Sequence, residues 1–251
     1  WTSNFTPPIK EYSSAIQSID IVDVLPISSA NIDDEDMVDI TDWIDDDNGT
    51  GDSSPVTFDS KSCMKNDTGA SAGTTNYSRR TQDIGTFGTR TVFSLNCYFD
   101  AIGTFAQQDY FAISVGNGTN GLEVYFCSNG LFVGNSSSVV NIGDWVVQDV
   151  WQEWTFDVDW ATLNVDVYLD GVLKASGVDC SAVSALANGK VYFDQRGTTT
   201  ANRITYIDWF KAGNAIVSYN PMSVTFNVVQ PYYNPVIVAN YLNLLPKPMS
   251  V

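Results

Sequence analysis

The sequence has no histidine among its 251 residues, and it has 12 Lys and Arg residues against 29 Asp and Glu residues. Without histidine there can be no Ser-His-Asp or Cys-His nucleophile, no histidine-ligated zinc and no side chain that ordinarily titrates near neutrality. Catalysis, if there is any, has to rest on carboxylates. The formal net charge of −17 disfavours nucleic acid and anionic membrane surfaces as partners, because binding to either needs Lys and Arg to displace counterions.

Long apolar runs are also missing. No stretch approaches the roughly 18 to 20 apolar residues of a membrane-spanning helix, so we expect no membrane insertion. Apolar residues still make up 44% of the chain, enough for one full all-β core. The cysteines are few, widely spaced and without a Cys-x-x-Cys pair, so they are either small buried hydrophobic residues or members of one or two disulfides. They are Cys63, Cys97, Cys127 and Cys180.

Negative charge is concentrated near the N-terminus. Residues 1–55 hold 13 of the 29 acidic residues and one of the 12 basic residues, a net charge of −12. We expect residues 1–39 to form an acidic arm that packs against a partner or a second small element. The basic doublet Arg79-Arg80 is predicted either to pair with acidic residues of this region, in the same or a neighbouring copy, or to be an ordinary surface pair.

Alternation of apolar and polar residues dominates the middle of the chain. The segment from Arg90 to Asp100 and the segment from Trp151 to Trp160 both follow a period of two, which indicates half-buried strands. Asp170-Gly171 between two apolar runs predicts a tight hairpin. Further strands are expected at 109–115, 121–128, 130–135, 164–170, 189–195 and 203–212. The residues expected to face the core include Phe93, Leu95, Cys97, Phe99, Trp154, Phe156, Val158, Trp160 and Trp209.

Many short strands separated by Gly, Asn and Asp predict an all-β fold, an antiparallel β-sandwich over residues 40–213. Residues 214–251 differ, because five prolines restrict their extended pieces to edges or isolated arms. We therefore expect an extended C-terminal arm. The segments Ile19–Leu25 and Val224–Val229 are predicted to pair with each other or with another copy.

Three runs of the chain follow a recognisable family pattern. They are Trp151-Gln-Glu-Trp-Thr-Phe-Asp-Val-Asp-Trp160, Val165-Asp-Val-Tyr-Leu-Asp-Gly-Val-Leu173 and Arg203-Ile-Thr-Tyr-Ile-Asp-Trp-Phe-Lys211. These runs resemble the second half of concanavalin A-like and laminin-G-like jelly rolls, and the resemblance extends over about residues 40–213 and implies a jelly-roll fold. The superfamily includes lectins, glycosidases, adhesion modules and virion fibre or capsid-decoration domains, so it does not fix a function. With an arm at each end, the chain is most similar to domains on phage structural proteins.

The catalytic signatures of that superfamily do not match. Its laminarinase-like members carry Glu-x-Asp-x-x-Glu on one strand, which sets two glutamates about 5 Å apart. This chain has four glutamates, and no two of them have that spacing. Asp157 and Asp159 are the nearest substitute, and they define the enzymatic alternative, a secreted polysaccharide-degrading glycosidase or lyase.

Two binding sites are predicted. The loop from Asp45 to Asp52 is a candidate Ca²⁺ site, with Asp45, Asp47 and Asp52 as oxygen ligands and glycines that permit a tight wrap. Its alternative is a solvated acidic loop. Trp145, Tyr110 and Phe111 are the candidate glycan-binding residues, because they adjoin loops and aromatic faces stack on sugar rings.

The function that we expect from these features is non-catalytic. The sandwich would be displayed outside a cell or on a virion surface, as a structural or binding protein with a lectin-like head for glycans. The two arms would attach it to copies of itself or to a capsid or cell-surface scaffold.

Overall fold

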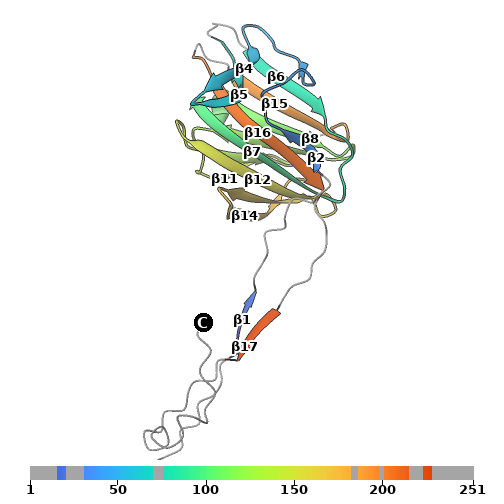
Figure 1. Ribbon diagram of the computed structural model, residues 1–251. Coiled ribbons are helices and arrows are strands. Elements are labelled where there is room, and N and C mark those ends of the chain that lie inside the picture. The colour runs from blue at the N-terminus through green and yellow to red at the C-terminus, as the bar shows by residue number, and fades with distance from the viewer. Residues whose placement is uncertain are drawn as a thin grey trace, which may run out of the picture. The chain divides into compact units, whose positions relative to one another are not determined.

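The computed structural model describes residues 16–20, 31–69, 76–181, 186–197, 201–214 and 223–227. The chain divides into two units, one spanning residues 25–217 and the other formed by residues 1–24 and 218–251. The larger unit is a sandwich of two antiparallel sheets, drawn as stacked layers in Figure 1. The expected all-β sandwich is therefore confirmed. The described part of the chain holds no helix with the length and apolarity of a membrane span.

The first layer is a seven-stranded sheet. Its central strands lie far apart in sequence, because β15 pairs with β8 on one side and with β6 on the other. The strands in spatial order are β11 (Val139–Gly143), β10 (Gly130–Gly134), β9 (Gly121–Cys127), β8 (Tyr110–Gly116), β15 (Lys190–Gly197), β6 (Asn76–Asp83) and β3 (Ile44–Asp45).

The second layer is an eight-stranded sheet built around the two longest strands, β7 and β16. Strand β2 (Asn31–Glu35) pairs with β16 beside the main path of the sheet. The remaining order is β14 (Val172–Asp179), β13 (Asn164–Leu169), β12 (Trp151–Asp159), β7 (Arg90–Ala101), β16 (Ile204–Asn214), β5 (Lys61–Asp67) and β4 (Asp52–Phe58).

The core lies between the sheets and is rich in aromatic side chains. Strand β12 buries Trp154, Phe156 and Val158, as the alternation predicts. These residues meet the opposite sheet through Phe126, whose ring centroid lies 5.4 Å from that of Trp154. Aromatic residues bury large areas and pack edge to face, which favours one relative position of the two sheets. Strand β7 contributes Phe93, Leu95, Cys97 and Phe99, all buried as expected.

One of two tight hairpin turns could be predicted from the sequence. Asp170 and Gly171 have φ values of 50° and 74°, which fits the predicted two-residue hairpin turn. A second turn of this kind joins β4 to β5, where Asp59 and Ser60 have φ values of 50° and 65°. That turn lacks the glycine that would have marked it in the sequence.

Trp209 does not face the core, contrary to the alternation. The pairing of β16 with β7 shifts between Ile207 and Trp209, which is a β-bulge. A bulge adds one residue to one strand and reverses the alternation beyond it. Ile207 is buried before the bulge and Phe210 after it, while Trp209 is half-buried with the Lys211 ammonium 5.6 Å from its ring.

The four cysteines are free and buried, so no disulfide joins the strands. Burial raises the pKa of Cys127 and of Cys180 to about 12, and it also raises the pKa of Cys97. These thiols are therefore protonated and unreactive at neutral pH. Of the two interpretations of the cysteines, that of small buried hydrophobic residues holds.

Part of the expected N-terminal arm belongs to the sandwich. Strand β2 lies within residues 1–39 and pairs with β16, and Met37 is completely buried in the core. In the smaller unit, β1 (Ile16–Asp20) pairs antiparallel with β17 (Ser223–Asn227), which brings Ile19 opposite Val224. The rest of residues 1–30 and of residues 215–251 lies outside the described residues.

Trp154 and Trp209 provide a stability test of this core. Replacing the completely buried Trp154 by Ala should lower the free energy of unfolding by about 3–5 kcal/mol, because it removes a large side chain and leaves a cavity. Trp209→Ala should cost much less, since that ring is half-exposed. Denaturant titration of both variants measures the difference, and equal losses would contradict the assigned orientations.

Candidate functional site

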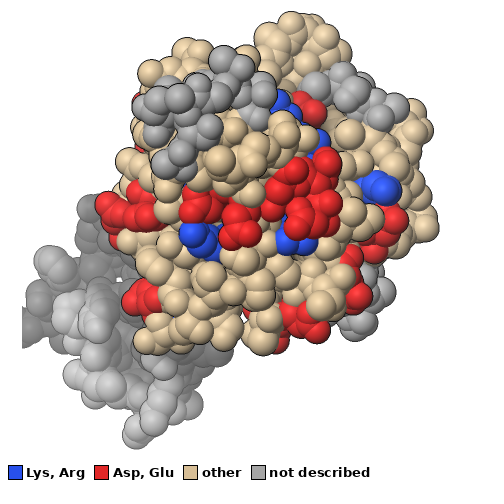
Figure 2. All heavy atoms as spheres, turned by 90° about the horizontal axis from the view of Figure 1, so that it is seen from above, with Lys and Arg blue, Asp and Glu red and all other residues tan. Residues whose placement is uncertain are grey.

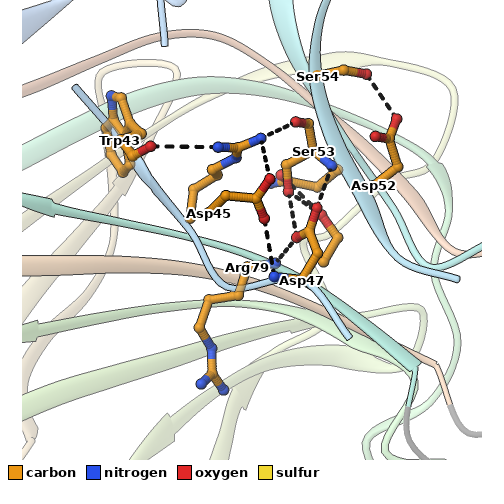
Figure 3. A network of polar contacts seen from close by, with 10 residues as sticks. Trp43, Asp45, Asp47, Asp52, Ser53, Ser54 and Arg79 are labelled. Atoms are coloured by element: carbon orange, nitrogen blue, oxygen red, sulfur yellow. Dashed lines mark hydrogen bonds and ion pairs between the residues drawn. The ribbon is translucent and has the colours of Figure 1, made fainter. Parts of the chain in front are cut away.

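The predicted calcium loop is held to the sandwich by arginine. Arg80 pairs with Asp45 at 3.1 Å, donates to the carbonyl of Trp43 at 3.4 Å and also donates to the carbonyl of Ser53. Arg79 pairs with Asp46 at 3.3 Å. The predicted pairing of the doublet with the acidic region is thus present within one chain. Figure 3 shows this network, in which the Asp47 carboxylate points toward the backbone amide of Arg79 and toward Ser53.

Asp47 is bound by three donors of the protein itself. Its carboxylate accepts hydrogen bonds from the Arg79 amide at 2.6 Å, the Ser53 amide at 2.8 Å and the Ser53 hydroxyl at 2.9 Å. Burial raises its pKa, although these bonds act in the opposite direction. Asp52 instead accepts from the Ser54 hydroxyl at 2.9 Å. Each acid of the loop thus has its own protein partner.

The three predicted calcium ligands do not form one cluster. Within the described residues no group of three or more Cys, Asp or Glu side chains is arranged to hold a metal ion. The sequence indicated an acidic loop correctly, but the nearby arginines and amides bind the carboxylates that were expected to bind calcium.

The predicted glycan residues lie in three different environments. Phe111 is completely buried in the core, where its ring lies 5.8 Å from that of Phe126. It has no accessible face and cannot stack on a sugar, so that prediction is corrected. Trp145 is half-buried and packs against the core. Tyr110, the preceding residue of β8, points to the opposite side of the sheet and forms part of a second, smaller aromatic cluster.

That cluster covers the outer face of the seven-stranded sheet. Tyr110 and Tyr125 meet edge to face at 4.9 Å between ring centroids. Phe105, from the short 3₁₀ helix η1 (Phe105–Gln107), stacks on Phe132 at 4.9 Å and on Tyr110 at 6.0 Å. We call Phe105, Tyr110, Tyr125 and Phe132 the outer aromatic cluster.

Charged residues continue the same face beyond the outer aromatic cluster. Strand register sets Tyr125 beside Ala112, Ala112 beside Asp194, and Asp194 beside Arg79. Directly paired residues of neighbouring strands share a face, so these side chains form one row across four strands. In the next row, Arg196 lies between Tyr110 and Tyr77.

Asp194 joins the two arginines of this face. Its Oδ2 accepts from Arg196 Nε at 2.8 Å and from Arg79 Nη2 at 2.9 Å. Both guanidinium groups also lie over the Tyr77 ring, at 4.8 Å for Arg79 and 5.9 Å for Arg196. No described residue accepts a hydrogen bond from the two terminal nitrogens of Arg196, so they remain available as donors beside the Tyr110 ring.

Two phenols of the outer aromatic cluster, those of Tyr110 and Tyr125, keep their protons at neutral pH. Burial raises the pKa of Tyr125 well above its usual value, and so does its 2.5 Å hydrogen bond to Glu123. Burial likewise raises the pKa of Tyr110. The face therefore combines neutral aromatic rings, a free guanidinium edge and carboxylate acceptors, which is the chemistry that binds sugar rings and their hydroxyl groups.

The acids of the enzymatic alternative lie on the other sheet. Asp157 forms a two-pronged ion pair with Arg90, with both N···O distances at 2.6 Å. Asp159 is slightly buried, but hydrogen bonds from the amides of Ala161 and Thr162 outweigh that burial and lower its pKa. Both carboxylates are engaged in structural contacts.

Of the predicted glycan residues, Tyr110 lies on this face, and the sequence did not predict the other residues that the sheet brings beside it. The missed residues come from five segments that only the sheet order brings together. Alternation within β15 and β9 did contain a signal, since it places Asp194 and Arg196 on one face of their strand and Glu123 and Tyr125 on one face of theirs. The missed residues are Phe105, Tyr125, Phe132, Arg79, Asp194 and Arg196.

Comparison with known proteins identifies the fold. No protein-family model matches the sequence, and neither does any curated protein. Among solved structures, a sialidase matches with a TM-score of 0.57 at 12% identity, over 77% of this chain and 19% of its own. An endo-β-1,4-glucuronan lyase from the fungus Trichoderma reesei matches with a TM-score of 0.53 at 14% identity, over 76% and 99% of the two chains. The chain has a concanavalin A-like jelly-roll fold.

A third jelly-roll match comes from a virus. It is a carbohydrate esterase from a Shiga toxin-encoding bacteriophage, with a TM-score of 0.51 at 14% identity, over 71% of this chain and 93% of that one. At these identities the three matches establish the jelly-roll fold alone.

The contacts of Asp47 predict that it stabilises the fold and does not bind calcium. Asp47→Ala should lower the free energy of unfolding by about 1–3 kcal/mol, because it leaves buried donors of Ser53 and Arg79 without an acceptor. Asp52→Ala is the matched control and should change stability by about 0.5 kcal/mol or less. Thermal unfolding should not respond to added Ca²⁺. A rise in Tm on adding Ca²⁺ that is absent in Asp47→Ala would contradict this prediction and support a calcium site in the loop.

Proposed function

We propose that the jelly roll binds carbohydrate chains, without cleaving them, on the outer face of its seven-stranded sheet. The observation that carries this proposal is the continuous face on which Tyr110, Tyr125 and Arg196 lie together. Its aromatic half offers ring faces, and its charged half offers donors and acceptors within one side-chain length. The matched lyase and phage esterase carry carbohydrate-related names, which supports this class of ligand.

The charges on this face favour neutral sugars over acidic ones. Arg79 and Arg196 share Asp194, so much of their positive charge is balanced on the spot. The whole chain has a net charge of −17. On the side of the molecule that Figure 2 views from above, acidic side chains gather with a few basic ones among them. Such a charge repels polyanions. The remaining donors of Arg196 suit hydroxyl oxygens of an uncharged glycan.

The absence of cleavage is supported by the positions of the carboxylates. Glu123 on β9 and Glu153 on β12 belong to different sheets and so cannot form a catalytic pair about 5 Å apart. Asp157 is held by Arg90 and Asp194 by two arginines. The competing enzymatic hypothesis is tested by incubating the protein with each glycan it binds and looking for shortened products.

The setting that we propose is the exterior of a cell or of a virion, where a glycan-binding head meets its ligand. The paired terminal segments β1 and β17 would then attach the head to copies of itself or to a scaffold. An isolated two-stranded pair is at best marginally stable in water, so it gains from a further strand or surface.

Glycan binding should depend on the outer face of the seven-stranded sheet. On an array of neutral and acidic oligosaccharides the protein should bind neutral ones, and Tyr125→Ala and Arg196→Ala should each weaken binding about tenfold or more, about 1.4 kcal/mol. Trp151→Ala, on the other sheet, is the control and should bind normally. Binding that survives both Tyr125→Ala and Arg196→Ala would refute the assigned face.

The terminal segments should be needed for assembly and not for folding. Removing residues 218–251 leaves the larger unit, which ends at residue 217. The truncated protein should keep the unfolding midpoint of the sandwich and its glycan binding. Light scattering before and after the truncation measures the oligomeric state. An unchanged oligomer would contradict the role given to these segments.

A further inference from the structure

The opposite face of the sandwich carries a second set of outward aromatic residues, which glycan binding does not use. Trp151 on β12 pairs in register with Tyr98 on β7, and Tyr98 pairs with Tyr206 on β16. Phe58 at the end of β4 stacks on Tyr206, with centroids 3.9 Å apart and planes within 3°. All four side chains are half-buried. We call them the aromatic row.

Exposed carboxylates border the aromatic row. Asp59 accepts a hydrogen bond from Trp151 Nε1 at 2.9 Å, and Asp149 accepts one from the Tyr98 hydroxyl at 3.4 Å. Burial raises the pKa of Tyr98, and the charges of Asp149, Asp100 and Asp59 raise it further, so all three acids act on the same hydroxyl. Among the described residues no Lys or Arg forms an ion pair with any of the three acids.

The aromatic row already holds one lysine of the chain itself between a ring and a carboxylate. The Lys61 ammonium lies 5.0 Å from the centroid of the Trp151 ring and 2.5 Å from the Asp208 carboxylate. A cation that meets a ring face and a carboxylate at once is stabilised by both. The contact shows within one chain how a basic side chain fits this surface.

Aliphatic side chains distinguish a peptide from a sugar as the occupant. Val147 and Val150, which precede Trp151 in the chain, are each 49% exposed. A peptide can cover them with its own apolar side chains while its basic residues reach Asp59 and Asp149. A glycan has no comparable apolar side chains. The exposed valines, the aromatic row and the unpaired acids therefore match one partner in apolar surface and in charge.

We propose that the aromatic row and its flanking acids form a docking surface for a basic segment of a partner protein, with arginine or lysine side chains between the rings and the carboxylates. This surface is separate from the proposed glycan face and does not depend on it.

The test uses the full chain and a 12-residue synthetic peptide that alternates arginine with leucine. Calorimetry should detect binding that weakens as salt is added, and a peptide with neutral citrulline in place of arginine should bind at least tenfold more weakly. Trp151→Ala should also weaken binding at least tenfold. Tyr125→Ala, on the glycan face, should bind the peptide as the unchanged protein does.

Single Asp→Asn variants disturb the fold little, and they distinguish specific docking from general attraction to an acidic protein. Asp149→Asn and Asp59→Asn should each weaken peptide binding severalfold, and asparagine tolerates the positive φ of 63° and 50° at these positions. Asp42→Asn removes one exposed charge elsewhere and should have little effect. Equal losses in all three variants would show general attraction to an acidic protein and overturn the proposal. So would a glucosamine oligomer that binds more strongly than the peptide and whose binding Trp151→Ala weakens while Tyr125→Ala does not.

Discussion

The structure depends on the burial of aromatic side chains between two sheets. Phe126 from one sheet packs against Trp154 and Phe156 from the other, and Phe193 packs edge to face against Phe210. Because alternate residues of a strand point to opposite faces, each inward ring fixes which neighbours face outward. The core thereby determines the composition of both outer faces, including the rows on which Tyr125 and Tyr98 lie.

Charge is organised around a small number of arginines. A chain with 29 acidic and 12 basic residues cannot neutralise itself evenly, and its arginines are placed where buried carboxylates would otherwise be unpaired. Arg90 serves Asp157, Arg203 serves the completely buried Asp109, and Arg79 serves Asp194. The two outer faces differ in how their central acids are balanced. Two arginines hold Asp194 on the seven-stranded sheet, whereas no described Lys or Arg forms an ion pair with Asp59, Asp100 or Asp149 beside the aromatic row.

The sequence predicted the layered fold because periodicity and turn chemistry are local properties. The strands at Arg90–Ala101 and Trp151–Asp159 lie within a residue of their expected bounds, and Asp170-Gly171 forms the expected turn. The prediction that Trp209 faces the core was wrong because of the β-bulge in β16. A bulge depends on the pairing with the neighbouring strand, and the alternation in the sequence did not show it. Strand β2 was missed because its acidic residues read as a solvated arm.

The candidate site was less predictable, because it depends on which strands are neighbours. Tyr125, Arg196 and Arg79 are far apart in sequence and meet only through the order β9-β8-β15-β6. Asp45, Asp47 and Asp52 show the converse. Their spacing along the chain suggested one metal site, whereas the fold gives each of them a different partner.

The glycan is proposed to bind one outer face of the sandwich, that of the seven-stranded sheet. Hydrogen–deuterium exchange with and without a bound neutral oligosaccharide tests this most directly, because it reports on every strand without a mutation. The bound oligosaccharide should slow exchange in β8, β9 and β15 and leave exchange in β7, β12 and β16 unchanged. Protection confined to β7, β12 and β16 would contradict this proposal.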